Sequence, residues 1–287
     1  VLYIGFYLYL CLHRWLAFLK LQGNLLLFQI TYKAKKLDMK NALLVIFLLF
    51  SFHSYGAGDK IEIPKYDWSW KGFFGTYDRA SAQRGLKVYR EVCAGCHSMN
   101  YLSYRNLGDL GFNEDHIKAI AAEYLILDGP NDEGEMFERD GMPSDQFANP
   151  YANIKAARAA NNGAYPPDLS LIVKARPKGA DYVKALLLGY VDPPKDMIIP
   201  SGQHYNKYMA GNLIAMTSPL SDGLVDYDDG TQNSMDQMTT DVTTFLAWAA
   251  EPSLEDRKRM GLKVILFLIV LFVLAYISKQ QIWRDVK

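Results

Sequence analysis

Residues 93–97 read Cys-Ala-Gly-Cys-His, a spacing with a defined chemistry. Two thiols separated by two residues can add to the two vinyl groups of a porphyrin, and the histidine that follows can then ligate the iron. A structural zinc site would need four ligands, and the sequence has no second Cys-x-x-Cys. A redox dithiol would need a thioredoxin-like βαβ setting, which the pattern lacks. Cys93, Cys96 and His97 therefore predict one covalently attached haem c, with His97 as an iron ligand.

The second axial ligand decides whether such a haem transfers electrons or binds small molecules. A methionine thioether closes the iron and raises its reduction potential. Methionine often only fills a core, however, so the residues alone leave the choice open. Met99 is too near the attachment turn to reach the opposite face, and Met260 lies at a predicted membrane segment. The remaining candidates are Met136, Met142, Met197, Met209, Met216, Met235, Met238, His116 and His204.

Helical periodicity predicts the elements that would hold this turn in place. A helix over residues 79–92 leads directly into the cysteines. Four more helices are predicted at 114–126, 153–161, 181–190 and 240–250, the last with Asp241 near its positive end. Gly- and Pro-rich stretches separate them at 128–150, 163–167, 191–202 and 217–230, and no strand alternation is evident. The sequence thus predicts a mostly α fold with long irregular insertions, organised around a cofactor.

The first 57 residues indicate processing segments rather than a domain. From Met39 onward, a short basic start, the apolar run 42–50 and small residues up to Ala57 are typical of a secretory signal peptide, here 39–57. The apolar run is too short to span a bilayer as a helix. Residues 1–38 precede this start and contain no methionine. We expect them to be a spurious or unassigned extension, with an extra membrane segment or a fusion remnant as the alternatives.

The other end predicts a membrane anchor. Residues 260–278 carry one charge, Lys263, and as a helix would cover roughly 28 Å, about the thickness of a hydrocarbon core. Basic residues precede this stretch, and Trp283 follows it as an interfacial anchor. Because the signal peptide would export residues 58–256, we expect a periplasmic haem domain, a single-pass anchor in the inner membrane, and a cytoplasmic tail at 279–287.

The charges are divided unequally along the chain. The total is neutral, with 31 basic and 31 acidic residues, but residues 58–256 hold 18 basic and 29 acidic ones. The lack of a basic bias gives nucleic-acid binding no support, and a half-hydrophobic composition excludes a disordered chain. Six acids lie in 128–140 and six in 221–241. Although such runs are often only solvated loops, we expect this acidic surface to steer a basic partner.

Longer segments resemble the cytochrome c1 family, the haem-bearing subunit of the cytochrome bc1 complex, in its bacterial form. Residues 156–176 read AARAANNGAYPPDLSLIVKAR, nearly the string that this family carries after its haem motif. Residues 248–252 (WAAEP) and 257–263 (RKRMGLK) match as well. The resemblance covers about residues 60–280 and is far more specific than the haem motif alone.

This resemblance implies a class I cytochrome c-like haem domain and roles for particular residues. Met216 occupies the position of the axial methionine, although Ser218 stands where the family usually has proline. Arg176 matches the arginine that pairs with a haem propionate, as a guanidinium fork suits a carboxylate. The positions that line the haem pocket correspond to Asn161, Pro166, Pro167 and Tyr182.

The function implied by the resemblance is electron transfer. A Rieske iron–sulfur protein would pass one electron to this haem during quinol oxidation, and the haem would reduce a soluble or tethered cytochrome c docked on the acidic surface. Cytochrome b would be a partner in a dimeric complex, and the chain would need no catalytic acid or base of its own. The alternatives are a free-standing membrane-anchored carrier, a haem sensor or peroxidase with an open iron, and a structural anchor with a vestigial motif.

Overall fold

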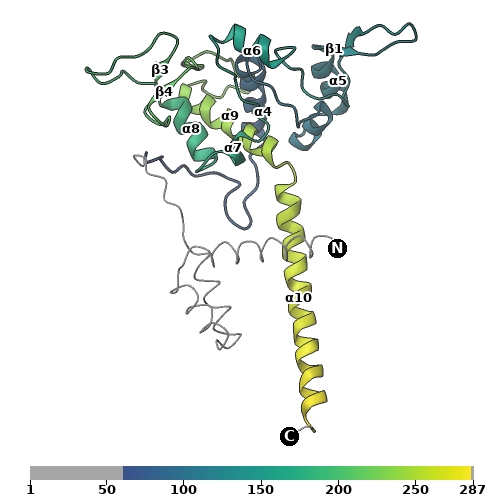
Figure 1. Ribbon diagram of the computed structural model, residues 1–287. Helices are drawn as coiled ribbons and strands as arrows, with labels where there is room; N and C mark the ends of the chain where they lie inside the picture. Colours follow the sequence, from purple (N-terminus) through teal and green to yellow (C-terminus); the bar gives the residue numbers. More distant parts are fainter. Residues whose placement is uncertain (1–60, 286–287) are drawn as a thin grey trace, which may run out of the picture. The chain divides into compact units, whose positions relative to one another are not determined.

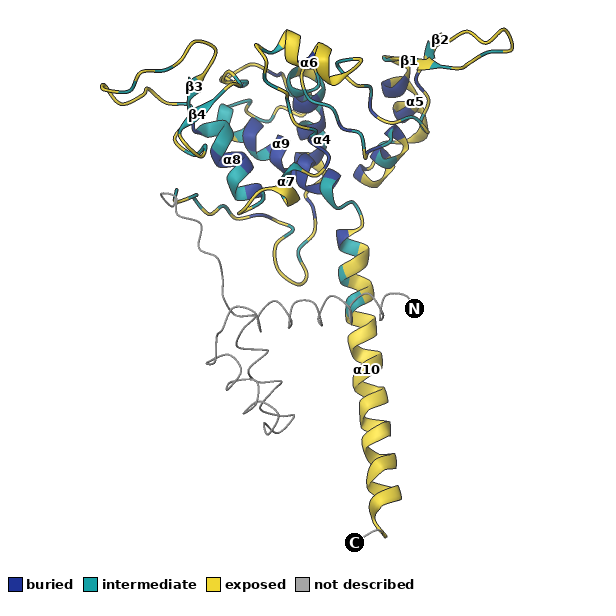
Figure 2. Cartoon of the chain, in the orientation of Figure 1, coloured by how far each residue is buried: buried dark blue, intermediate teal, exposed yellow. Residues whose placement is uncertain are grey.

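The computed structural model describes residues 61–285, and at its centre two helices cross in close contact (Figure 1). These are α4 (Arg79–Val88) and α9 (Met235–Ala250). Gly85 makes the close approach possible, because a Cβ there would lie 2.0 Å from the carbonyl oxygen of Asp241. Every residue of α9 from Asp241 to Ala249 is buried, as Figure 2 shows. The predicted extension 1–38, the predicted signal peptide 39–57 and the last two residues of the predicted tail lie outside the described residues.

A buried carboxylate joins the two central helices. Asp241 has no exposed surface and accepts hydrogen bonds from Ser81 Oγ at 2.7 Å, Arg84 Nε at 2.9 Å and Gln237 Nε2 at 3.0 Å. The bond to Asp241, together with one to Asp229, raises the pKa of Arg84 in spite of burial, so Arg84 stays charged beside Asp241. The prediction that Asp241 lies near a helix start was wrong. The helix begins earlier, at Met235, so Asp241 falls in its buried middle and is neutralised by α4.

The remaining helices surround this pair, which confirms the mostly α fold class. α8 and α7 pack on α9, and α5 packs on η2. Asn side chains at positions 113 and 153 cap α5 and α6, and Asp78 caps α4, which explains where these helices begin. The further helical elements are the π-helical turn η1 (Tyr89–Cys93), the 3-10 helix η2 (Tyr104–Leu110), α5 (Glu114–Ala122), α6 (Ile154–Ala160), α7 (Ile172–Ala175) and α8 (Ala180–Leu188).

Two small antiparallel hairpins are present, although the sequence shows no evident strand alternation. β1 (Leu125–Asp128) pairs with β2 (Phe137–Asp140), with Leu125 opposite Asp140. β3 (His204–Tyr205) pairs with β4 (Leu213–Ile214). The helix predicted over 114–126 was therefore wrong at its end, because residues 125 and 126 pair with a strand beyond the next turn. Strands of four and two residues are too short to show a recognisable alternation.

A long apolar helix follows the central pair. α10 (Leu254–Trp283) is the one helix among residues 61–285 that is long and apolar enough to cross a membrane, with a mean hydropathy of 2.7 over 18 residues, none of them buried. The predicted anchor 260–278 lies inside it. Between the two helices, residues 251–253 interrupt the helical path, and Lys258 and Glu255 tie the first turns of α10 to the segment before α4.

The core beside the cysteine turn is aromatic. The ring centroids of Tyr104 and Phe147 are 4.6 Å apart, and Tyr89 lies 6.0 Å from Phe147 and 5.6 Å from Phe245. All four side chains are buried, and Cys93 packs against the hydrophobic core that contains them. Stacked and edge-to-face rings of this kind pack rigidly, so they give the end of η1 a firm base.

Candidate functional site: the Cys-x-x-C-His turn and its surroundings

The turn that carries the motif is held by backbone bonds and by the core. η1 ends at Cys93, whose carbonyl accepts hydrogen bonds from the backbone N–H groups of Cys96 at 3.1 Å and His97 at 2.9 Å. The buried Tyr89 donates its hydroxyl to the carbonyl of His97 at 3.2 Å. The three motif side chains therefore project from one compact, anchored turn.

A hydrogen bond fixes the orientation of the imidazole. Nδ1 of His97 lies 2.7 Å from the carbonyl oxygen of Pro167. A carbonyl can only accept, so Nδ1 carries the proton and Nε2 of the neutral ring keeps a free lone pair. Burial lowers the pKa of His97, which favours this neutral form. Pro167, expected only to line a pocket, thus supplies the bond that orients the imidazole of His97, the predicted iron ligand.

Asp168 joins the segment that follows the motif, residues 98–100, to the segment of residues 168–170. This residue was not predicted from the sequence. Its Oδ2 accepts from Ser98 Oγ at 2.9 Å and from the backbone N–H of Asn100 at 2.8 Å, while its Oδ1 accepts from the backbone N–H of Ser170 at 2.8 Å. Burial opposes its ionisation, but these bonds outweigh burial and lower the pKa of Asp168. The sequence signal was an aspartate directly after Pro167 with a serine two residues later, which favours an Asx turn.

The donor set fits a c-type haem. Cys93 and Cys96 are both free thiols. Burial raises the pKa of Cys93 to about 12, so this thiol stays protonated, and Cys96 is exposed. Two thiols and a neutral imidazole with a free Nε2 on one turn are the groups that attach such a macrocycle and ligate its iron.

Met216 lies in a segment held by tyrosines. Tyr190 donates its hydroxyl to the carbonyl oxygen of Met216 at 3.1 Å. Burial raises the pKa of Tyr190, and the nearby Tyr182 adds to this effect. Tyr182 donates to the sulfur of Met209 at 3.5 Å, and burial raises the pKa of Tyr182, an effect that the positive charge of Arg176 opposes. Tyr190, which sequence reasoning missed, is the residue that bonds to the segment of Met216.

The other predicted pocket residues have different surroundings. Asn161 donates to Tyr151 Oη at 3.0 Å and to the carbonyl of Ala157 at 2.7 Å, so its amide closes the end of α6. Pro166 is half-buried beside Pro167, and Arg176 is exposed at the end of α7. An exposed guanidinium in that place is accessible to a carboxylate, whereas the Asn161 amide is already engaged.

Comparison with known proteins identifies the family. A sequence model described as "Cytochrome C1 family" matches residues 68–286. This chain belongs to the cytochrome c1 family. The resemblance indicated by the sequence is thereby confirmed, and the Cys-x-x-Cys-His turn and the long apolar helix both lie inside the matched range.

Relatives in this family come from mitochondria and bacteria. "Cytochrome c1 1, heme protein, mitochondrial" of Arabidopsis thaliana is 49% identical over 243 residues, which cover 83% of this chain and 79% of the relative. "Cytochrome c1" of Rhodospirillum rubrum is 48% identical, over 79% of this chain and 89% of the relative. "Cytochrome b/c1" of Bradyrhizobium diazoefficiens is 48% identical over 77% of this chain but only 36% of its own length.

Proposed function

We propose that this chain is the electron-transfer haem subunit of a membrane quinol–cytochrome c oxidoreductase. It accepts one electron from a Rieske iron–sulfur protein and reduces a cytochrome c. The observation that carries the proposal is the His97 imidazole, oriented by Pro167 on a turn with two free thiols, in a chain of the cytochrome c1 family. The related Candida albicans protein is named "Cytochrome b-c1 complex catalytic subunit, mitochondrial", which supports cytochrome b as a partner.

The residues of this chain hold and tune a single haem c. The bound haem supplies a one-electron change at its iron. Cys93 and Cys96 would attach it through thioether bonds, and His97 and Met216 would ligate its iron. Tyr190 restrains the backbone at Met216, and Asp168 keeps the turn against Pro167. Arg176 would pair with a propionate, and the residues that would line the pocket are Asn161, Pro166, Pro167 and Tyr182.

Leucine in place of Met216 should open the iron. The variant loses its thioether ligand, so we expect a lower reduction potential and binding of carbon monoxide by the reduced protein. Leucine in place of Met209 is the matched control, because its sulfur already accepts the Tyr182 hydroxyl. Redox titration and carbon monoxide difference spectra measure both effects. If only the Met209 variant bound carbon monoxide, Met216 would be rejected as the ligand.

The two acidic segments differ in how far their charges are neutralised. In 221–241, Arg84 pairs with Asp229 and Asp241, Lys87 with Asp228, and Lys184 with Asp236. The hairpin segment 128–140 is less compensated. Arg139 pairs with Asp128, and within the described residues no cation forms an ion pair with the exposed acids Asp132, Glu133, Glu135, Glu138 and Asp140. The β1–β2 hairpin is therefore our proposed docking surface for a basic cytochrome c.

Neutralising two hairpin acids should slow the reaction with the carrier. For Glu133→Gln with Glu135→Gln, we expect the second-order rate constant with a basic cytochrome c to fall about three- to tenfold at low salt, since steering depends on uncompensated charge. Asp228→Asn with Asp229→Asn removes the same charge from paired sites and should change the rate less. The difference should vanish near 1 M salt, where the screening length is about 3 Å. Equal slowing by both pairs would contradict docking at the hairpin.

We also propose how the chain is arranged across the membrane. Residues 39–57 export the chain, residues 58–256 form the periplasmic haem domain, and 260–278 anchor it in the inner membrane with the tail 279–287 in the cytoplasm. The apolar, unburied surface of α10 supports the anchor. The complex is expected to be dimeric.

Isolation of the assembled complex tests this function. A complex purified in mild detergent by capturing this chain should contain a cytochrome b and an iron–sulfur protein, and quinol should reduce its haem. If the chain is isolated alone with a reducible haem, it is a free-standing carrier and the subunit proposal fails. A preparation with no thioether-type haem spectrum would reject electron transfer altogether.

A further inference from the structure

A short aromatic loop is attached to α10 at the level where the helix becomes apolar. Lys258 Nζ donates to the carbonyl oxygens of Trp70 at 2.7 Å and Gly75 at 2.9 Å, so one side chain of α10 holds both ends of the loop. The loop bends sharply at Gly75, where a Cβ would lie 2.1 Å from the carbonyl oxygen of Lys71. This attachment sets the position of the loop along the helix axis.

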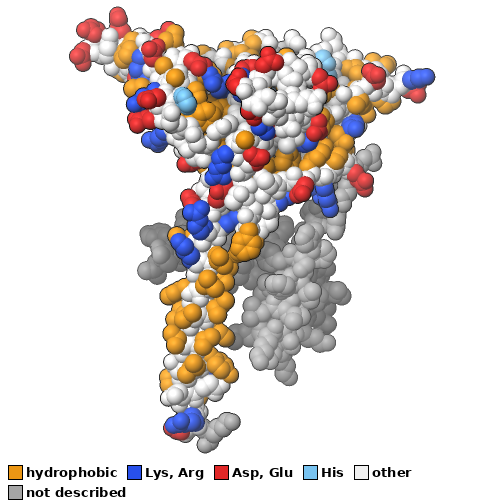
Figure 3. Space-filling model, turned by 180° about the vertical axis from the view of Figure 1, so that it is seen from behind, with side chains coloured by type: hydrophobic (Ala, Val, Ile, Leu, Met, Phe, Trp, Pro, Cys, Tyr) orange, Lys and Arg blue, Asp and Glu red, His pale blue; other side chains and the backbone are white. Residues whose placement is uncertain are grey.

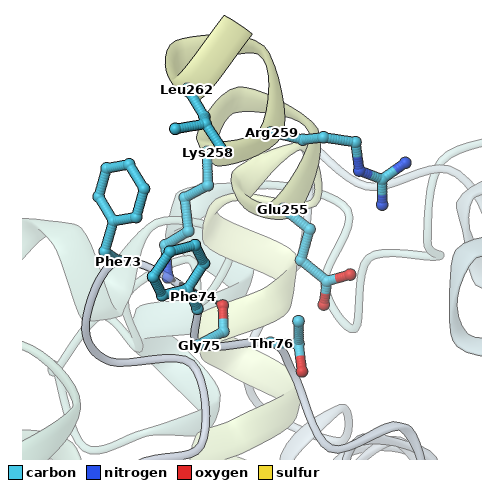
Figure 4. Close-up of a pocket in the computed structure, with 8 residues that line it drawn as sticks. All are labelled: Phe73, Phe74, Gly75, Thr76, Glu255, Lys258, Arg259 and Leu262. Carbon is cyan, nitrogen blue, oxygen red and sulfur yellow. Dashed lines mark hydrogen bonds between the residues drawn. The ribbon is translucent and has the colours of Figure 1, made fainter. Parts of the chain in front are cut away.

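The tip of this loop exposes two phenylalanines. Phe73 is 51% exposed and Phe74 is 81% exposed, and their rings meet edge-to-face with centroids 4.9 Å apart. Figure 4 shows both rings beside the first turns of α10, with Lys258 reaching from the helix toward the loop. Exposing two adjacent large apolar rings to water is unfavourable, whereas Phe is among the side chains that become buried at the boundary between headgroups and acyl chains.

A pocket of about 210 Å³ lies between this loop and α10. Its wall combines the two phenylalanines and Leu262 with charged residues one turn earlier. The full lining is Phe73, Phe74, Gly75, Thr76, Glu255, Lys258, Arg259 and Leu262. One part of the wall is thus apolar and continuous with the spanning helix, and the other is polar.

The polar part of the pocket carries surplus positive charge. Glu255 is neutralised by a paired Arg79 and also accepts from the backbone N–H of Tyr77 at 2.8 Å. Within residues 61–285, Lys258 donates hydrogen bonds only to carbonyl oxygens. In the same part of the chain, Arg259 pairs only with Asp256, at 3.8 Å, and the side chains of both Arg259 and Asp256 are well exposed. Figure 3 shows Lys and Arg side chains gathered where α10 begins, next to the hydrophobic side chains of the helix.

We propose that this pocket binds an anionic phospholipid of the bilayer that α10 spans. Arg259 and Lys258 face the phosphate of the headgroup, and the acyl chains run along Phe73, Phe74 and Leu262 into the hydrocarbon. The apolar surface beyond Leu262 supports this occupant, since a ligand that bridges charge and hydrocarbon at this level is a lipid. The inference rests on the proposed anchor and is independent of the haem.

Photo-crosslinking measures this binding directly. The full chain is reconstituted in phosphatidylcholine nanodiscs that contain a photoactivatable phosphatidylglycerol, and labelled peptides are mapped by mass spectrometry. We expect labelling of residues 70–76 that falls about fivefold in Arg259→Gln, since one basic residue near a membrane contributes about that factor. Arg257→Gln is the matched control, because Arg257 pairs with Glu251 and does not line the pocket.

The apolar contribution has its own variant. Phe74→Ser should also reduce labelling, whereas Ile198→Ser, which removes an exposed apolar side chain that does not line the pocket, should not. Equal labelling in the Arg259→Gln and Arg257→Gln chains would overturn the proposal. So would an assembled complex in which residues 70–76 crosslink to a neighbouring subunit instead of to lipid. A carbonate wash that releases the wild-type chain would instead reject the anchor itself.

Discussion

A chain with alanine at both Cys93 and Cys96 should retain no haem after denaturation. Both thiols are free and lie on the same turn as His97, so each is available to form a thioether. Alanine can form no such bond, and the remaining axial ligands hold a haem only while the protein is folded. We expect haem staining on a denaturing gel to be lost completely, together with the thioether-type pyridine haemochrome band.

Single substitutions give the graded control for this result. Cys96 is the exposed one of the two cysteines, and Cys96→Ala removes only its own thioether. One thioether would remain through Cys93, and a haem-staining band should persist at reduced intensity. A stained band in the double variant would show that attachment does not use this motif.

Alanine in place of Asp241 should lower the free energy of unfolding of the domain that precedes α10 by about 3–5 kcal/mol. The substitution leaves the charge of Arg84 without its buried partner, and removing one member of a buried ion pair typically costs this much. It also removes the acceptor for Ser81 and Gln237. Denaturant unfolding of the detergent-solubilised full chain, followed by circular dichroism, measures the loss.

The second partner of Arg84 supplies the comparison for this prediction. Asp229 is 45% exposed at its side chain and bonds the same guanidinium at 2.7 Å. Because exposed pairs contribute little, Asp229→Asn should cost less than about 1 kcal/mol. Replacing both Arg84 and Asp241 by leucine or methionine should recover much of the loss, since apolar residues can substitute for a buried pair. Equal losses in the two aspartate variants would show that burial of Asp241 does not matter.

Local patterns were sufficient for α4, α6, α8 and α10 and for the motif turn. The helix at 260–278 was predicted from composition alone, because a helix that can span a membrane is a long, predominantly apolar stretch. The helices at 79, 153 and 181 were predicted within a few residues because capping side chains and periodicity act within one turn of helix. Residues 1–60 lie outside the described part of the chain, so the signal peptide stays a prediction.

Long-range contacts account for what local patterns left out. β1 and β2 were not predicted because each is stabilised by the other and not by its own alternation. The predicted acidic surface at 221–241 proved largely paired, because its partners Arg84, Lys87 and Lys184 come from distant helices. A count of charges along a segment cannot reveal which of them another segment neutralises.

The sequence by itself determined the chemistry of the site and the membrane segment. Covalent haem attachment needs two thiols and a histidine at fixed spacing, and residues 93–97 have that spacing. Only the tertiary structure decided how the imidazole is oriented and what holds it. The Pro167 carbonyl, the Asp168 carboxylate and the Tyr190 hydroxyl each act on residues 26–70 positions away. The physical reason is that a hydrogen bond depends on distance in space, which a sequence pattern specifies only for near neighbours.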